Sequence, residues 1–71
     1  MNYPTKEQVM DADKFRLAIW QRFLPSPGMN FIDENNFREK LEEEVEIQNL
    51  ISYRFRELGG WTPQLSKEIG F

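Results

Sequence analysis

The chain contains neither cysteine nor histidine. Without cysteine it has no disulfide, no thiol nucleophile and no cysteine ligand for zinc. Without histidine it lacks the general base of the common serine and cysteine hydrolases and a frequent ligand of transition metals. Together the two absences disfavour an enzyme, and we expect neither a cofactor nor a metal ion.

Long hydrophobic runs are missing too, and basic residues are outnumbered. The chain has nine Lys and Arg against twelve Asp and Glu, a net charge of −3. No stretch approaches the ~20 apolar residues of a membrane span, and the first thirty residues lack the apolar core of a signal peptide. Proteins that bind nucleic acid carry a basic face, so this charge disfavours nucleic acid as a partner. We expect a cytoplasmic protein that does not enter a membrane.

Aromatic residues, in contrast, are plentiful for so short a chain. Ten of the 71 residues are Phe, Trp or Tyr. Each can bury about 150–250 Å² of surface, which is enough to build a small core. At this length a second independent core is excluded, so residues 1–71 are expected to form a single helical domain.

The spacing of turn residues predicts an all-α fold. Pro, Gly and Asn are concentrated at residues 25–30 and 59–63, and no segment alternates apolar and polar residues with a period of two. We expect a small helical bundle in which one long central helix, at about 33–58, is packed by a shorter helix at about 14–24. Two short terminal helices, at about 6–11 and 63–69, complete it.

Capping residues support these boundaries. Thr5 with Gln8 predicts a capping box, and Asp11 or Asp13 is expected to cap the next helix. Asp33 is the expected cap of the central helix, and the Gly59-Gly60 pair its stop. The final helix is expected to begin after Thr62, with Pro63 at its first position, and to end at Gly70.

The second helix is apolar over an arc of roughly 200°, wider than the stripe of a surface helix. We therefore expect it to be covered on two sides. The two terminal helices are short, so two outcomes remain open. Either the 25–31 loop and the 60–71 tail fold back and finish the core, with five apolar plugs: Phe31, Trp61, Leu65, Ile69 and Phe71. Or a strip stays uncovered and forms an interface, for which a two-fold homodimer is the commonest solution.

The central helix has an apolar face interrupted by Glu44 and Gln48, four residues apart. The residues of this face are Phe37, Leu41, Val45, Ile47, Ile51, Phe55 and Leu58. We predict that Glu44 forms a buried charge pair with Arg22 or Arg16 of the second helix, because an unpaired carboxylate on an apolar face is costly. The acidic residues at 39–46 point in different directions around a helix. They are therefore expected to form a solvated face and not a metal site.

Four aromatic residues flank the Pro25–Gly28 loop and the double-glycine stop, and we take them as candidate core or interaction anchors: Trp20, Phe23, Phe31 and Trp61. Their simplest role is in the core. Any of them left exposed would mark a binding patch.

Three stretches together resemble a family of short, uncharacterised bacteriophage and prophage proteins. They are residues 4–9 (PTKEQV), residues 20–28 (WQRFLPSPG) and residues 57–71, which read ELGGWTPQLSKEIGF. Members of that family often end in Trp where this chain has Phe71. The resemblance implies a phage origin and a location in the cytoplasm of a bacterium, but it brings no activity and no functional residue.

The leading hypothesis is therefore a small non-enzymatic protein-interaction module of phage or prophage origin. It rests on aromatic richness, missing catalytic residues and the acidic face. The alternative is a structural or assembly component that acts mainly through self-association. The sequence identifies no partner and does not fix the oligomeric state.

Overall fold

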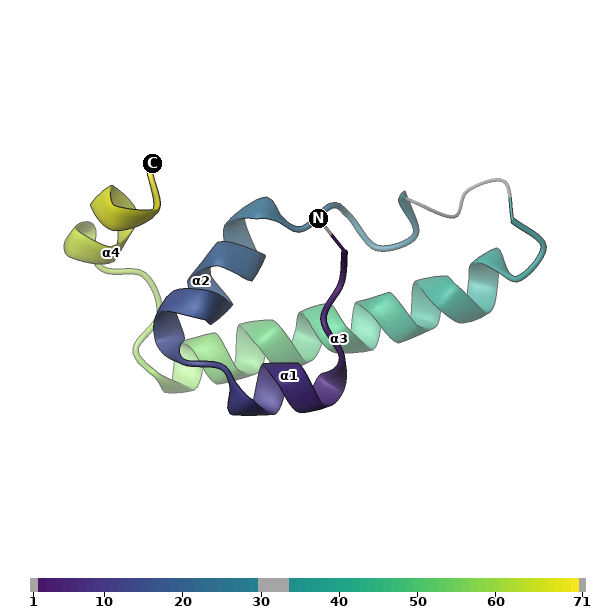
Figure 1. Cartoon of the computed structure of the whole chain (residues 1–71), viewed down its shortest axis with the longest axis horizontal. Coiled ribbons are helices and arrows are strands. Elements are labelled where there is room, and N and C mark those ends of the chain that lie inside the picture. The colour runs from purple at the N-terminus through teal and green to yellow at the C-terminus, as the bar shows by residue number, and fades with distance from the viewer. Residues whose placement is uncertain (1, 30–33, 71) are drawn as a thin grey trace.

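The computed structural model describes residues 2–29 and 34–70, and in these ranges all regular structure is helical. The order is α1 (Lys6–Asp11), α2 (Lys14–Phe23), α3 (Phe37–Glu57) and α4 (Pro63–Ile69). The predicted all-α fold, with one long helix packed by shorter ones, is confirmed. The molecule measures 42 × 23 × 14 Å, and α3 runs along its longest axis (Figure 1).

The expected caps set three of the four helix starts. Thr5 and Gln8 form the reciprocal capping box of α1, and the Asp13 side chain accepts from the Arg16 amide at the start of α2. The Thr62 side chain accepts from the Leu65 amide at the start of α4. Because each cap satisfies a backbone donor that the helix itself leaves unpaired, the short helices begin where the sequence predicts.

The long helix begins later than predicted, at Phe37 and not near residue 33. Asp33, its expected cap, lies outside the described residues. Asn36 occupies the cap position without a side-chain hydrogen bond, and the Phe37 amide donates to the Glu34 carbonyl. Asparagine favours turns over helix interiors, so the Asn35-Asn36 pair forms a turn in place of the first helical turn.

The end of α3 follows the glycine rule. The Gly60 amide donates to the Phe55 carbonyl at 2.9 Å and the Gly59 amide to the Arg56 carbonyl at 3.1 Å. This is the pair of bonds of a Schellman motif, and it requires a left-handed residue, which Gly59 supplies with φ of +109°. The chain therefore reverses sharply and directs α4 back toward α2, which α4 contacts.

The core lies between α2 and the C-terminal half of α3, with α1 and α4 closing its ends. In Figure 1, α2 and α3 run in opposite senses along the long axis, with α2 inclined to α3, and the two helices are in contact. The buried apolar side chains form one cluster: Val9, Leu17, Ala18, Trp20, Ile47, Ile51, Phe55 and Leu65.

The tail does fold back, since Leu65 is 8% exposed and Ile69 packs against the core cluster. Two residues assigned to the apolar face of α3 are not in the core, because Val45 and Leu58 are 38% and 44% exposed. Phe31 and Phe71, also expected as plugs, lie outside the described residues.

Candidate functional site

Two regions of the described chain bring together side chains that could bind a ligand or a partner. One is a polar network beneath the N-terminal half of α3, and the other is the outer face of α2. The first accounts for the buried charge, and the second leaves apolar side chains in solvent.

The polar network centres on Glu44, which is 7% exposed. Its Oε1 accepts a hydrogen bond of 2.9 Å from the backbone amide of Gly28. Four residues further along α3, the Gln48 side chain donates to the hydroxyl of Tyr3 at 2.9 Å, and that hydroxyl donates to the Pro25 carbonyl. The network therefore ties the N-terminal segment and the 24–29 loop to one face of α3.

This arrangement corrects the prediction that Glu44 forms a charge pair with Arg22 or Arg16. Within residues 2–29 and 34–70 the salt bridges are Lys6–Glu46 and Lys40–Glu34, and neither includes Glu44. The guanidinium carbon of Arg22 lies 5.4 Å from the ring centroid of Phe23. A backbone N–H reaches a buried carboxylate with less side-chain ordering than an arginine needs, which explains why the loop and not α2 provides the donor.

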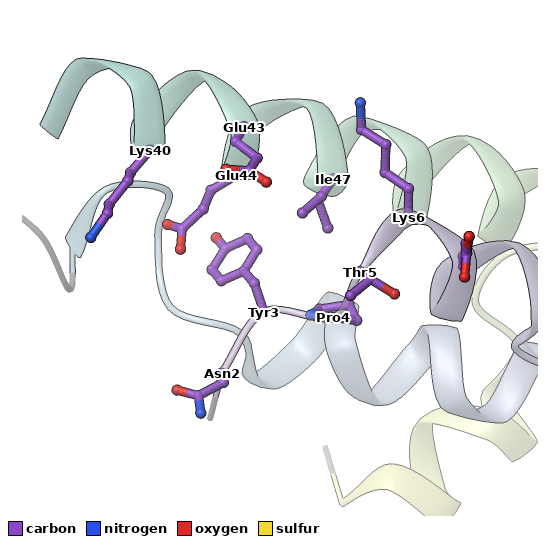
Figure 2. A pocket seen from close by; sticks show the side chains of 10 residues that line it. Asn2, Tyr3, Pro4, Thr5, Lys6, Lys40, Glu43, Glu44 and Ile47 are labelled. Carbon is purple, nitrogen blue, oxygen red and sulfur yellow. The ribbon is translucent and has the colours of Figure 1, made fainter. Parts of the chain in front are cut away.

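A groove of about 720 Å³ opens beside the network, and Figure 2 shows its lining. The Tyr3 side chain points from the N-terminal segment toward α3, with the Glu44 carboxylate near its hydroxyl. Burial raises the pKa of Tyr3 above its usual value of 10.0, the Gln48 hydrogen bond opposes this, and the nearby Glu44 charge adds to it. The phenol is thus held in its protonated form, in which it can donate to Pro25.

Nothing in this groove forms a catalytic constellation. The Glu44 carboxylate accepts from an amide, and the described chain has no buried side-chain nitrogen or oxygen without a hydrogen bond. Nor do the described residues contain a group of three side chains able to hold a metal ion. The network is built to fasten the fold.

The outer face of α2 is different. Phe15, Ile19 and Phe23 are spaced four residues apart, so they form one row, which we call the α2 row. Phe15 is 45% exposed, Phe23 is 50% exposed and Ile19 is half-buried. Leu17, which faces the core, lies about 160° around the helix from Ile19 at 100° per residue.

Arginine side chains border the α2 row. The Arg16 guanidinium carbon lies 5.9 Å from the centroid of a Trp20 ring, and Arg22 lies over Phe23 in the same way. Beside Arg16 is a hollow of about 480 Å³, lined by Asp13, Phe15, Arg16, Ile19 and Trp20. Trp20 therefore has two roles: it is 9% exposed and belongs to the core, and its remaining surface lines the hollow.

The predicted anchors do not share one environment. Trp20 lies in the core, and Phe23 lies in the exposed α2 row. Trp61 packs edge-on against Phe55, with ring centroids 5.0 Å apart. Because it is 39% exposed, it is not the buried plug that the sequence predicts. Phe31 lies outside the described residues.

The sequence pattern predicted the apolar arc of α2 but not which part of it remains exposed. The expectation of cover on two sides is met by α3 and α4, which both contact α2. The α2 row points away from the core side and stays in solvent. Its signal in the sequence is the i, i+4, i+8 spacing of Phe15, Ile19 and Phe23, on the opposite side from Leu17.

Compared with protein-family models, with curated proteins and with solved structures, the chain has no match. The resemblance to phage proteins therefore stays a prediction. Along the described ranges, no helix combines the length and the apolar character needed to cross a bilayer.

Proposed function

We propose that the chain is a small non-enzymatic protein-interaction module of phage or prophage origin, acting in the bacterial cytoplasm, and that it docks a partner on the outer face of α2. The observation that carries this proposal is the α2 row. A helix anchored in the core by Leu17 and Trp20 presents two half-exposed phenylalanines on its other side.

An exposed apolar row of this kind contributes more to binding a partner than to the stability of the fold. Exposed aromatic rings gain nothing from the core, and large aromatic side chains next to a hollow are the usual anchors of interfaces. The opposite side of α2 is fixed by the core cluster, so the row is presented on a rigid support. Docking therefore costs little ordering of the backbone.

The remaining chemistry supports a non-enzymatic role. The buried Glu44 carboxylate and the hydroxyl of the half-buried Tyr3 both hold backbone groups of the 24–29 loop. A catalytic acid or base needs access to a substrate proton, and these groups are already committed to the fold.

A second copy of the chain is a poorer occupant of this face than another protein. The α2 sequence, KFRLAIWQRF, contains three basic residues and no acidic one. Two α2 helices facing each other would therefore meet with charge of the same sign, which opposes association.

Site-specific photo-crosslinking in bacterial cells tests the proposal. We replace Phe23 by benzoylphenylalanine, and in a matched control we replace Tyr53, which is 62% exposed on α3. We expect a discrete product with another protein from position 23 and none from position 53, and we expect Phe15→Ser to abolish it. Equal products from both positions would contradict the proposal, and a product of two copies alone would favour the self-association alternative.

A further inference from the structure

We infer that the partner presents an amphipathic helix whose apolar stripe is bordered by carboxylates, with one large apolar side chain that enters the hollow beside Trp20. This inference rests on the proposed docking function and names the chemistry of the partner. It follows from the charge of α2, the position of Arg16 and the shape of the surface.

The α2 helix carries a positive charge, whereas the whole chain carries a negative one. The chain carries a net charge of −3, yet α2 contributes Lys14, Arg16 and Arg22 and no acidic residue. Arg16 and Arg22 lie over aromatic rings of this face, Asp13 lines the hollow beside them, and the Lys14 ammonium lies next to Gly59. The α2 row is thus bordered by two basic side chains in an acidic protein. Complementary charge across an interface speeds encounter and rejects wrong partners, so the edges of the partner should be acidic.

Arg16 is positioned to bind such an edge. Its guanidinium is held over the Trp20 ring at 5.9 Å, and within the described residues no carboxylate forms a salt bridge with it. Glu7, Asp11 and Asp13 line a second hollow together with Arg16. Asp13 accepts from the Arg16 backbone amide at 2.8 Å as the helix cap. A guanidinium that stacks on a ring can still present its N–H edge to a carboxylate, often in bidentate form.

The shape of the surface favours a helix over an extended segment. A row of three apolar residues at four-residue spacing offers ridges that match the i, i+4 ridges of another helix. The ten residues of α2 are about 15 Å long, which suits a partner helix of three to four turns. The hollow lined by Phe15, Ile19 and Trp20 then receives one bulky apolar side chain of that helix.

Three synthetic helical peptides test the inference. They share one stripe of Leu with a central Phe, and the residues that border the stripe are all Glu, all Gln or all Lys. Binding to the full chain is measured by fluorescence anisotropy, and the contacted residues are mapped by amide chemical shifts in the nitrogen-15-labelled chain. We expect the Glu peptide to bind at least tenfold more tightly than the Lys peptide, with the largest shifts in residues 14–23.

Charge reversal supplies the matched control. In Arg16→Glu the preference should reverse, so that the Lys peptide binds more tightly than the Glu peptide. Arg38→Glu makes the same change of charge on an exposed position of α3 and should leave the preference intact. Ile19→Ser should weaken all three peptides at least fivefold, and circular dichroism confirms that each variant remains helical.

The outcomes separate this inference from the proposed function. If the three peptides bind α2 equally well, the acidic chemistry of the partner is wrong while docking at the α2 row stands. If none of them shifts the amides of residues 14–23, the helical partner is wrong as well. Photo-crosslinking from position 23 tests docking at the α2 row independently of both peptide results.

Discussion

At the scale of single residues, the fold depends on polar contacts that join distant parts of the chain. Gly28 is the clearest case, because it donates its amide to the buried carboxylate of Glu44 and lies against the start of α3. Its φ of +82° is in the left-handed region, where a residue without a side chain is preferred.

We predict that Gly28→Ala destabilises the protein by about 2–4 kcal/mol, the sum of left-handed strain and overpacking. An added Cβ would lie 2.9 Å from both Leu41 Cδ1 and Phe37 Cε2. Denaturant unfolding measures the loss. Gly70→Ala is the matched control, because its φ is +100° but nothing lies within 4 Å of the added atom, so only the strain of about 1–2 kcal/mol applies. Equal losses in the two variants would disprove the close packing at Gly28.

Tyr3 is predicted to make the free energy of unfolding depend on pH in the alkaline range. Its pKa is raised in the folded state by burial, so above about pH 10 the unfolded chain releases the phenolic proton more readily than the folded chain. Stability from this group is complete below pH 10 and declines as pH rises through the raised pKa.

Unfolding by urea between pH 8 and pH 11 tests this, with Tyr3→Phe as the reference. The Lys6–Glu46 pair, in which a hydrogen bond to Glu46 raises the pKa of Lys6, is present in both proteins and cancels in the comparison. The stability advantage of the parent over Tyr3→Phe should shrink above about pH 10. An advantage that stays constant to pH 11 would show that the hydroxyl does not hold the N-terminal segment.

Sequence reasoning found the burial of Glu44 but assigned it the wrong donor. The apolar neighbours of Glu44 on α3 fixed its burial, since four-residue spacing determines which side chains share a face. The donor depends on the path of the 24–29 loop, which helical periodicity does not describe. For the same reason the Tyr3–Pro25 hydrogen bond, between residues 22 positions apart, had no signal in the pattern.

At the scale of elements, α1 depends on a residue of another helix. Arg54 of α3 donates to the carbonyls of Val9 and Ala12, at the C-terminal end of α1. A six-residue helix is unstable alone, and a cation at its C-terminus satisfies its last carbonyls and favours its dipole. Arg54 also lies in the last turn of α3, where its positive charge favours the dipole of its own helix.

We predict that Arg54→Met lowers the free energy of unfolding by about 1.5–3 kcal/mol, the usual worth of hydrogen bonds to a charged group. Arg56→Met, at an exposed position two residues away, should change stability by less than about 0.5 kcal/mol. Hydrogen exchange should also show faster exchange of the α1 amides in Arg54→Met alone. If both variants lose the same stability, the positive charge near the end of α3 stabilises the protein and the contact of Arg54 with α1 does not.

The last helix is the second short element that relies on contact with others. Thr62, Pro63 and Gly70 set its boundaries in the sequence, and these boundaries were predicted correctly. Its position depends on the double-glycine reversal and on the burial of Leu65, which is 8% exposed.

We predict that Leu65→Ala costs about 2–3 kcal/mol, toward the lower end for a buried leucine because the site is at the edge of the core. Gln64→Ala, on the exposed side of the same helix, should be close to neutral. Thermal unfolding followed by circular dichroism compares them. A neutral Leu65→Ala would mean that α4 adds nothing to the core.

At the scale of the whole molecule, α3 carries six of the acidic residues, whereas α2 carries three basic residues, no acidic residue and the α2 row. The corresponding row on the outer side of α3 is Val45, Asn49 and Tyr53, and a polar residue interrupts it. The α2 row has no such interruption. A head-to-tail contact between the two faces would place the α2 row on a row that Asn49 interrupts, which favours another protein over a second copy as the proposed occupant.

The central claim is that the two sides of α2 have different duties, one in folding and one in docking. The most direct test is the free energy of unfolding of the double variant Phe15→Ser/Phe23→Ser, measured beside Trp20→Ala. We predict that the double variant stays within about 1 kcal/mol of the parent, as exposed positions do. Trp20→Ala should lose about 3–5 kcal/mol, as expected for truncation of a buried tryptophan. A loss of 3 kcal/mol or more in the double variant would show that the α2 row belongs to the core, and would contradict the account.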